Sequence, residues 1–155
     1  MSEIHADLTS SANVTNAVAL PENTGLCFVG VMKGGPFDRT EDEAKAMLAA
    51  PINPNGRPNS DVVKRSLIGR DVVQRNQRGW LIDFGEMAAA DAALYVLPFE
   101  YVRREGKPLC DTNRDRLMNQ NWWLHGRSRP ALRRALNGLK RCIVTPEVTK
   151  HRVFA

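Results

Sequence analysis

Glycine and proline turns interrupt this chain so often that none of its helices or strands can be long. Pro51 ends one apolar stretch, Gly85 ends another, and Asn53 to Asp61 is a dense run of turn formers. Between these breaks, helically spaced segments and short apolar runs alternate irregularly and without a repeat. The pattern favours an α+β fold, a single mixed domain with short strands and several short helices, over a doubly wound parallel sheet.

A chain of 155 residues can bury one core. Residues 1–24 are polar and lack a clear hydrophobic period, so we expect a loosely ordered lead-in there and one domain over residues 25–155. The apolar stretches fall short of the roughly 20 residues that span a bilayer. The N-terminus also lacks the basic start and apolar run of a signal peptide. We therefore expect a cytoplasmic protein without a membrane partner.

Local patterns predict the individual elements. Thr40 and Glu43 match a capping box and predict a helix over residues 41–50. Residues 53–61 are expected to form an exposed, irregular loop. Further helices are expected over residues 87–97, from Pro98 to Gly106, over residues 113–124, and from Pro130 to near Gly138 with Ser128 as the cap. Strands are expected over residues 27–31, 61–68, 80–84, 142–145 and 148–154. Because the last of these stops at the final residues, we expect the natural domain to continue past residue 155.

The charge of the chain is concentrated in its last third. Residues 1–60 hold 4 Lys/Arg and 7 Asp/Glu, residues 61–100 hold 5 and 6, and residues 101–155 hold 13 and 4. The net charges of these parts are therefore −3, −1 and +9. Such a concentration of cations attracts polyanions. It indicates nucleic acid or an acidic partner surface, and a solvated basic face without a partner is the alternative.

No set of residues in the sequence forms a convincing catalytic or metal site. Lys33-Gly34-Gly35-Pro36 lacks the spacing of a phosphate-binding loop, and Asn53-Pro54-Asn55-Gly56 lacks the aromatic ring that holds a flipped base. Glu43-Ala44-Lys45 has the triplet of some nucleases but no acidic partner. The histidines and cysteines also lack a ligand spacing, at His5, His125, His151, Cys27, Cys110 and Cys142. We expect no cofactor and no metal in this chain.

Polar and basic loops remain as candidates for binding. Arg57, Asn59 and Ser60 carry donors suited to base edges or phosphates. Arg127 and Arg129 follow the pair Trp122-Trp123 and precede a predicted helix N-terminus, a natural anion site. At least one of the two tryptophans is expected to pack in the core. For the two arginines, DNA contact and solvated charge remain equally open.

Several blocks of the sequence, in this order, resemble one family. They are Phe28-Val29-Gly30, Lys33 to Phe37, Asn53 to Val63, Trp80 to Gly85, Pro98 to Val102, Trp122 to Arg127 and Lys150 to Arg152. Together they are similar to the MmeI-type DNA methyltransferases of restriction-modification systems. In that family a domain that binds S-adenosylmethionine and methylates adenine is followed by a target-recognition region. The resemblance implies a partial, incomplete target-recognition domain, because the nuclease, the cofactor site and the catalytic loop are absent from this chain.

The sequence thus leads to the hypothesis of a sequence-specific DNA-recognition module without its own catalytic site. Double-stranded DNA is the expected partner, together with a separately encoded methyltransferase domain that would hold S-adenosylmethionine. An active small methyltransferase, a gene remnant and a docking subunit are the alternatives. The residues expected to contact DNA are polar or basic: Lys33, Arg57, Asn59, Ser60, Arg127, Arg129, Arg133, Arg134, Lys140, Arg141, Lys150 and Arg152.

Overall fold

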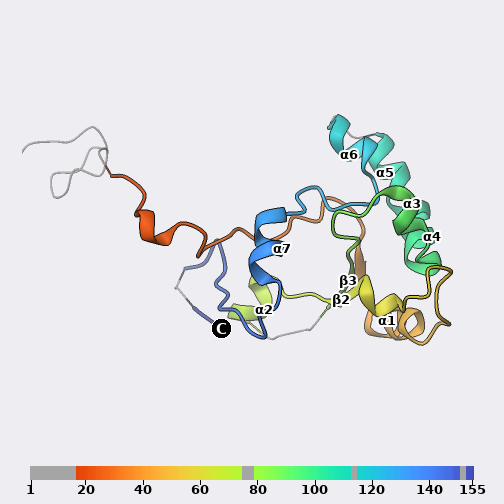
Figure 1. Cartoon of the computed structure of the whole chain (residues 1–155), viewed down its shortest axis with the longest axis horizontal. Helices are drawn as coiled ribbons and strands as arrows, with labels where there is room; N and C mark the ends of the chain where they lie inside the picture. The colour runs from red at the N-terminus through yellow and green to blue at the C-terminus, as the bar shows by residue number, and fades with distance from the viewer. Residues whose placement is uncertain (1–16, 75–78, 113–114, 151–152) are drawn as a thin grey trace, which may run out of the picture.

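The computed structural model describes residues 17–74, 79–112, 115–150 and 153–155. In these ranges the chain forms short helices and a small antiparallel sheet, which confirms the predicted mixed α+β class (Figure 1). The sheet and most helices form a compact body at one end of the long axis. Helix α7 (Pro130–Leu136), helix α2 (Gly69–Val73) and the two terminal segments lie toward the other end.

Three strands form the sheet in the order β1-β3-β2. Strand β3 (Trp80–Ile82) is central and pairs antiparallel with β1 (Asp38–Arg39) and with β2 (Val63–Arg65). The predicted strands over residues 61–68 and 80–84 are confirmed in place, and both are shorter than expected. Alternate side chains of β2 and β3 reach the core, since Val63 pairs with Ile82 on the buried face.

Helix α1 (Glu41–Leu48) begins at the predicted capping box. The Thr40 hydroxyl accepts a hydrogen bond from the Glu43 N–H at 3.3 Å, and Glu43 Oε2 accepts one from the Thr40 N–H at 3.0 Å. These two bonds satisfy donors that the first turn of a helix leaves unpaired. The helix stops ahead of Pro51 as predicted, and Ala44 faces the core.

Four short helices follow the sheet: α3 (Ala89–Ala93), α4 (Val96–Glu105), α5 (Lys107–Asp111) and α6 (Arg116–Gln120). The predicted boundary between the helix over residues 87–97 and the next one is wrong. Helix α4 begins before Pro98, which lies in its first turn, where a missing N–H costs no helical hydrogen bond. The helix predicted over residues 113–124 shortens to α6, and residues 113 and 114 lie outside the described ranges.

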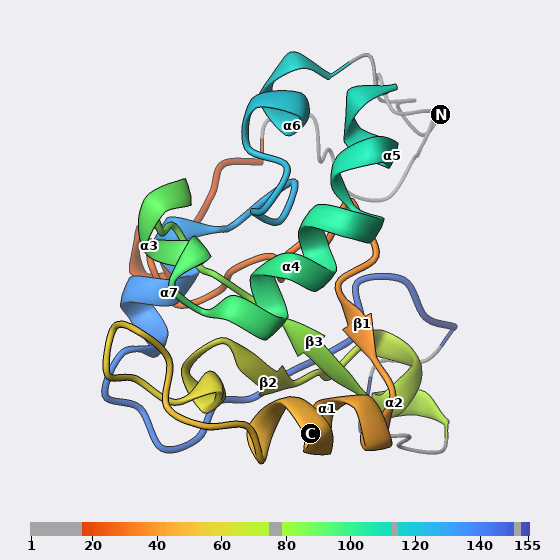
Figure 2. The same cartoon turned by 90° about the vertical axis from the view of Figure 1, so that its right-hand side faces the viewer.

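The core lies between the sheet, α1, α3 and α4 (Figure 2). Phe84 is at its centre, with ring centroids 6.5 Å from Tyr95 and 6.0 Å from Phe99. Trp122 and Trp123 pack against this cluster while partly exposed, so the expected packing of at least one tryptophan is confirmed. Trp123 Nε1 donates a hydrogen bond to the carbonyl oxygen of Met87 at 2.9 Å.

The strands predicted over residues 27–31 and 142–145 are wrong, and the described part of residues 148–154 forms no strand either, while residues 151 and 152 lie outside the described ranges. These segments lie along the surface, and Ile143 and Val148 are 81% and 92% exposed. Apolar runs become strands only where a neighbour supplies backbone partners. In the described ranges, Met32 forms a single bridge with Arg127, and Val144 and Ala155 exchange two backbone hydrogen bonds.

The N-terminal part that the structure describes begins with an exposed stretch. Residues 17–27 all face solvent and include a single 3₁₀ turn, η1 (Pro21–Asn23). They extend away from the body (Figure 1). The chain first meets the rest of the fold at Gly30 and Met32, where hydrogen bonds from Arg129 and Arg127 hold it.

Candidate nucleic-acid interface

The loop before α7 and α7 itself carry four of the predicted contact residues. Arg129 precedes the helix with a left-handed backbone (φ 56°), and Pro130 occupies the first turn. The prediction that Ser128 caps α7 is wrong, because no side chain caps the N-terminus of this helix. The Ser128 carbonyl oxygen instead accepts a hydrogen bond from Arg133 Nε at 2.7 Å.

An ion pair fixes α7 to the end of β3. Arg133 Nη1 donates to Asp83 Oδ2 at 2.9 Å, and Arg133 Nη2 donates to Asp83 Oδ1 at 2.8 Å. The same carboxylate accepts a hydrogen bond from the Gly85 N–H at 2.9 Å. Burial by itself would raise the pKa of Asp83, but these donors and nearby positive charge hold it below its usual value. Arg133 therefore has an internal carboxylate as its partner, and we no longer count it among the residues expected to contact phosphates.

His125 completes this buried arrangement. Its side chain is 1% exposed, its Nε2 lies 3.5 Å from Asp83 Oδ1, and its ring meets Phe37 edge-on at 4.5 Å. Burial lowers the pKa of His125 below its ordinary value, since the charged imidazole loses its hydration there. The residue thus belongs to the support of the loop before α7.

The loop between α6 and α7 is joined to the N-terminal segment. Arg127 N–H donates to the Met32 carbonyl oxygen at 3.1 Å, and Arg129 Nε donates to the Gly30 carbonyl oxygen at 3.2 Å. Both arginines keep further guanidinium donors toward solvent. Lys33 forms an ion pair with Asp38 at 2.6 Å, so its charge is already compensated. Lys33 is therefore a weaker candidate than the two arginines.

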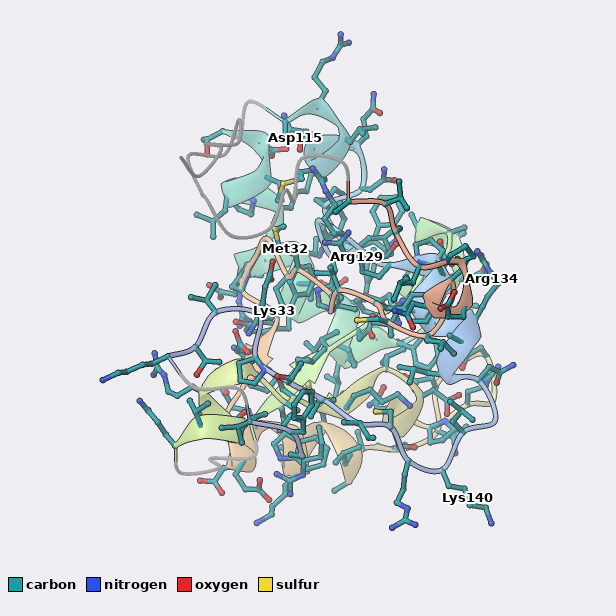
Figure 3. All side chains as sticks on the ribbon, turned by 90° about the vertical axis from the view of Figure 1, so that its left-hand side faces the viewer. Met32, Lys33, Asp115, Arg129, Arg134 and Lys140 are labelled. Carbon is teal, nitrogen blue, oxygen red and sulfur yellow. The ribbon has the colours of Figure 1, made fainter. Side chains whose placement is uncertain are left out.

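The described cations after Arg133 have no such partners. Arg134 on α7 is exposed, and the segment that follows it carries Lys140, Arg141 and Lys150, also exposed. Within the described ranges, no carboxylate forms an ion pair with any of these four side chains. Figure 3 shows Arg134 and Lys140 toward one edge of the face that carries Arg129 near its centre. Arg152 lies outside the described residues.

The second predicted contact region, residues 53–61, is largely the exposed, irregular loop that was expected, but Asn53 and Asn59 are buried in it. Asn59 begins the 3₁₀ turn η2 (Asn59–Asp61) and is 2% exposed. Its Nδ2 donates to the Met47 carbonyl oxygen at 2.8 Å, and its Oδ1 accepts from Asn53 Nδ2 at 2.9 Å. Asn53 is buried as well, and its Oδ1 accepts from the Val96 N–H at 3.2 Å. The prediction of a groove-facing Asn59 is wrong, because the fold uses its amide internally.

The other two residues of this region remain at the surface. Arg57 Nε lies 2.5 Å from Asp61 Oδ2, and this hydrogen bond raises the pKa of Arg57. Ser60 is exposed. In Figure 1 this loop lies at the right-hand end of the molecule, whereas α7 lies near the middle. Arg57 and Ser60 therefore do not join the surface formed by α7 and the C-terminal segment.

No metal or catalytic cluster accompanies this surface in the part of the chain that the structure describes. No group of three or more His, Cys, Asp or Glu side chains could hold a metal there. The triplet Glu43-Ala44-Lys45 lies on α1, where Glu43 serves the capping box. The three cysteines are free, and Cys110 is buried while Cys27 and Cys142 are exposed.

Comparisons with known proteins identify no family. No family model, no curated protein and no solved structure matches this chain. The resemblance to MmeI-type methyltransferases thus stays a prediction. Within the described ranges, every helix is too short or too polar to cross a membrane.

Sequence reasoning missed Asp83 as the residue that positions α7. Asp83 precedes a glycine at the end of a strand, a context that suggests a turn, and its partner Arg133 lies 50 residues later. No local pattern connects two such residues. The basic content of residues 101–155 pointed to this candidate region, but it could not separate Arg133, which pairs with Asp83, from its exposed neighbour Arg134.

Proposed function

We propose that this chain is a DNA-binding module that contacts the phosphate backbone through α7 and the segment that follows it. The observation that carries the proposal is the set of exposed cations without internal carboxylates, Arg134, Lys140, Arg141 and Lys150. Arg127 and Arg129 extend this set toward α6. Exposed cations without internal carboxylates release counterions when they meet phosphates, which favours binding of a duplex.

The proposed biological setting is target recognition for an adenine-specific DNA methyltransferase. Its support is the ordered set of sequence blocks similar to MmeI-type enzymes. In this setting S-adenosylmethionine and the catalytic residues belong to a separately encoded domain. The module contributes backbone contacts and orientation, and base contacts would add sequence preference.

The test is the salt dependence of duplex binding, measured by fluorescence anisotropy with the full chain. We expect affinity to fall steeply between low and moderate salt, whatever the sequence. Substituting both Lys140→Ala and Arg141→Ala should weaken binding about tenfold and lower the salt slope by about two. Absence of binding at low salt would refute the proposal.

The matched control removes the same charge from another adjacent basic pair. Arg103→Ala and Arg104→Ala act on α4, where Arg103 pairs with Glu100 and Arg104 with Glu105. Because these cations are already compensated, we expect a change in affinity of less than about twofold. An equal loss in both double variants would mean that net charge, and not this surface, determines binding.

A further inference from the structure

A pocket of about 340 Å³ lies between α6 and the first residues of α7. Its apolar walls are Leu117, Met118, Leu124 and Pro130. A pocket of this size falls within the range of small-ligand sites. It adjoins the proposed DNA-contacting surface, because Arg127 and Arg129 line it as well.

The floor of the pocket is held by close backbone packing. Gly34 has a left-handed backbone (φ +75°), and a Cβ there would lie 2.6 Å from Met118 Cε. The Gly126 N–H donates to the Lys33 carbonyl oxygen at 2.9 Å, next to the bridge between Met32 and Arg127. The site is therefore formed before any ligand arrives, which reduces the ordering cost of binding.

The polar groups of the pocket suit an anion attached to a hydrogen-bonding ring. Arg127 and Arg129 bring two guanidinium groups, and no carboxylate appears among the described residues that line the site. The Asn121 amide and the Ser128 hydroxyl line it too, and neither side chain has a hydrogen bond within the described ranges. An amide offers both donors and an acceptor, and a guanidinium matches the geometry of a phosphate.

We propose that this pocket takes one unstacked nucleotide of the bound nucleic acid. The base lies between the apolar walls and meets the Asn121 amide, while its phosphate lies at Arg127 and Arg129. The inference rests on the proposed function and deepens it, because it adds recognition of an unpaired base to backbone contact. Figure 3 places Arg129 on the same face as Arg134 and Lys140, so one strand can reach both regions.

The experiment compares a fully paired duplex with a duplex of the same length that carries a single unpaired nucleotide. We expect the full chain to bind the bulged duplex about five- to tenfold more tightly. Asn121→Asp, which places a carboxylate inside the pocket, should abolish this preference. The matched control Asn137→Asp adds the same charge at the exposed end of α7, outside the pocket. It should weaken both duplexes alike and keep the preference.

The Met118 methyl group provides a direct readout of the pocket. With methyl-labelled methionine, its resonance should shift with the bulged duplex and with a free mononucleotide. Equal affinity for both duplexes would refute the pocket assignment and leave the proposed function standing, whereas binding to neither would refute both. A shift with octanoate but not with the mononucleotide would identify an apolar carboxylate as the occupant and also overturn the inference.

Discussion

In the body of the fold, several arginine and lysine side chains pair with carboxylates, whereas the described ones along residues 134–150 end in solvent. Arg65 lies over the Trp80 ring and pairs with Glu41, whose exposed carboxylate also accepts a hydrogen bond from Trp80 Nε1. These hydrogen bonds lower the pKa of Glu41 to about 2. Lys140 and Arg141 have no comparable neighbours in the described ranges. The body uses its charges to hold its elements together, and the C-terminal segment keeps its charges available.

Apolar side chains show the same difference. Phe84 is fully buried among aromatic rings, while Phe154 near the C-terminus is 66% exposed. The body encloses its apolar residues because the turns bring strands and helices back against each other. The terminal segments have little to pack against, and Pro146 is a rare buried residue there; it lies beside the start of α2, where a Cβ added to Gly69 would be 3.3 Å from Pro146 Cβ. The stability of the fold should therefore reside in the body.

The largest expected effect tests this division with one change of residue type. Phe84→Ala should lower the free energy of unfolding by about 3–5 kcal/mol, because it leaves a cavity in the core. Phe154→Ala should change it by less than about 0.5 kcal/mol. Urea denaturation followed by tryptophan fluorescence measures both. A comparable loss in the two variants would show that the C-terminal segment belongs to the cooperative core.

The next effect concerns the connection between the two regions. Asp83→Asn should lower the free energy of unfolding by about 2 kcal/mol, since it leaves the half-buried Arg133 without its carboxylate. The control Glu86→Gln changes an exposed carboxylate nearby and should cost less than about 0.5 kcal/mol. Thermal denaturation of the unchanged protein and of the two variants measures these losses. No difference between the two variants would mean that α7 is not anchored through this pair.

Helix starts provide a smaller contrast. Thr40→Ala removes the capping box of α1 and should lower the free energy of unfolding by about 1 kcal/mol, while Thr40→Ser should retain the cap.

Helix α7 has no side-chain cap, and Arg129 holds a left-handed backbone that glycine adopts freely. Arg129→Gly should therefore change stability by less than about 0.5 kcal/mol, because lost strain offsets the lost hydrogen bond to Gly30. Circular dichroism during urea denaturation measures all three, and a large loss in Arg129→Gly would contradict this expectation.

The smallest expected effect is a pH dependence at the same junction. Because burial lowers the pKa of His125, the unfolded chain binds a proton there more readily than the folded chain does. Stability should therefore decline as the pH falls below 6.5, and His125→Phe should flatten that decline. The lowered pKa of Asp83 acts at more acidic pH, where its stabilising contribution is lost as the pH falls below 3.8. Unfolding curves collected across this pH range test both predictions. If the free energy of unfolding of His125→Phe depends on pH as steeply as that of the unchanged protein, His125 is not the source of the decline.

The sequence predicted those elements whose signals are local. The capping box of Thr40 and Glu43 identified the start of α1, and the apolar run at Trp80 identified the central strand. Pro51 and Gly85 marked the breaks between elements. Such features depend on neighbours within a few residues, so periodicity and turn chemistry are enough to find them.

Features that depend on distant partners were missed. The apolar run from Cys27 to Val31 has strand composition, but no segment pairs with it in the described ranges. Asn59 has the composition of an exposed turn, yet Asn53 and Met47 enclose its amide. For the candidate site, the sequence found the basic region, while the role of Arg133 depends on a carboxylate far away in the chain.

The half-buried bond between Arg133 and Asp83 has a consequence for how the protein responds to its ionic surroundings. Mobile ions screen exposed charges at moderate concentrations, but they reach a partly enclosed pair poorly. The support of α7 should therefore persist under conditions that already weaken attraction at Lys140 and Arg141. The proposed attachment to a polyanion would thus be adjusted by the surrounding electrolyte while the architecture that presents these side chains stays intact.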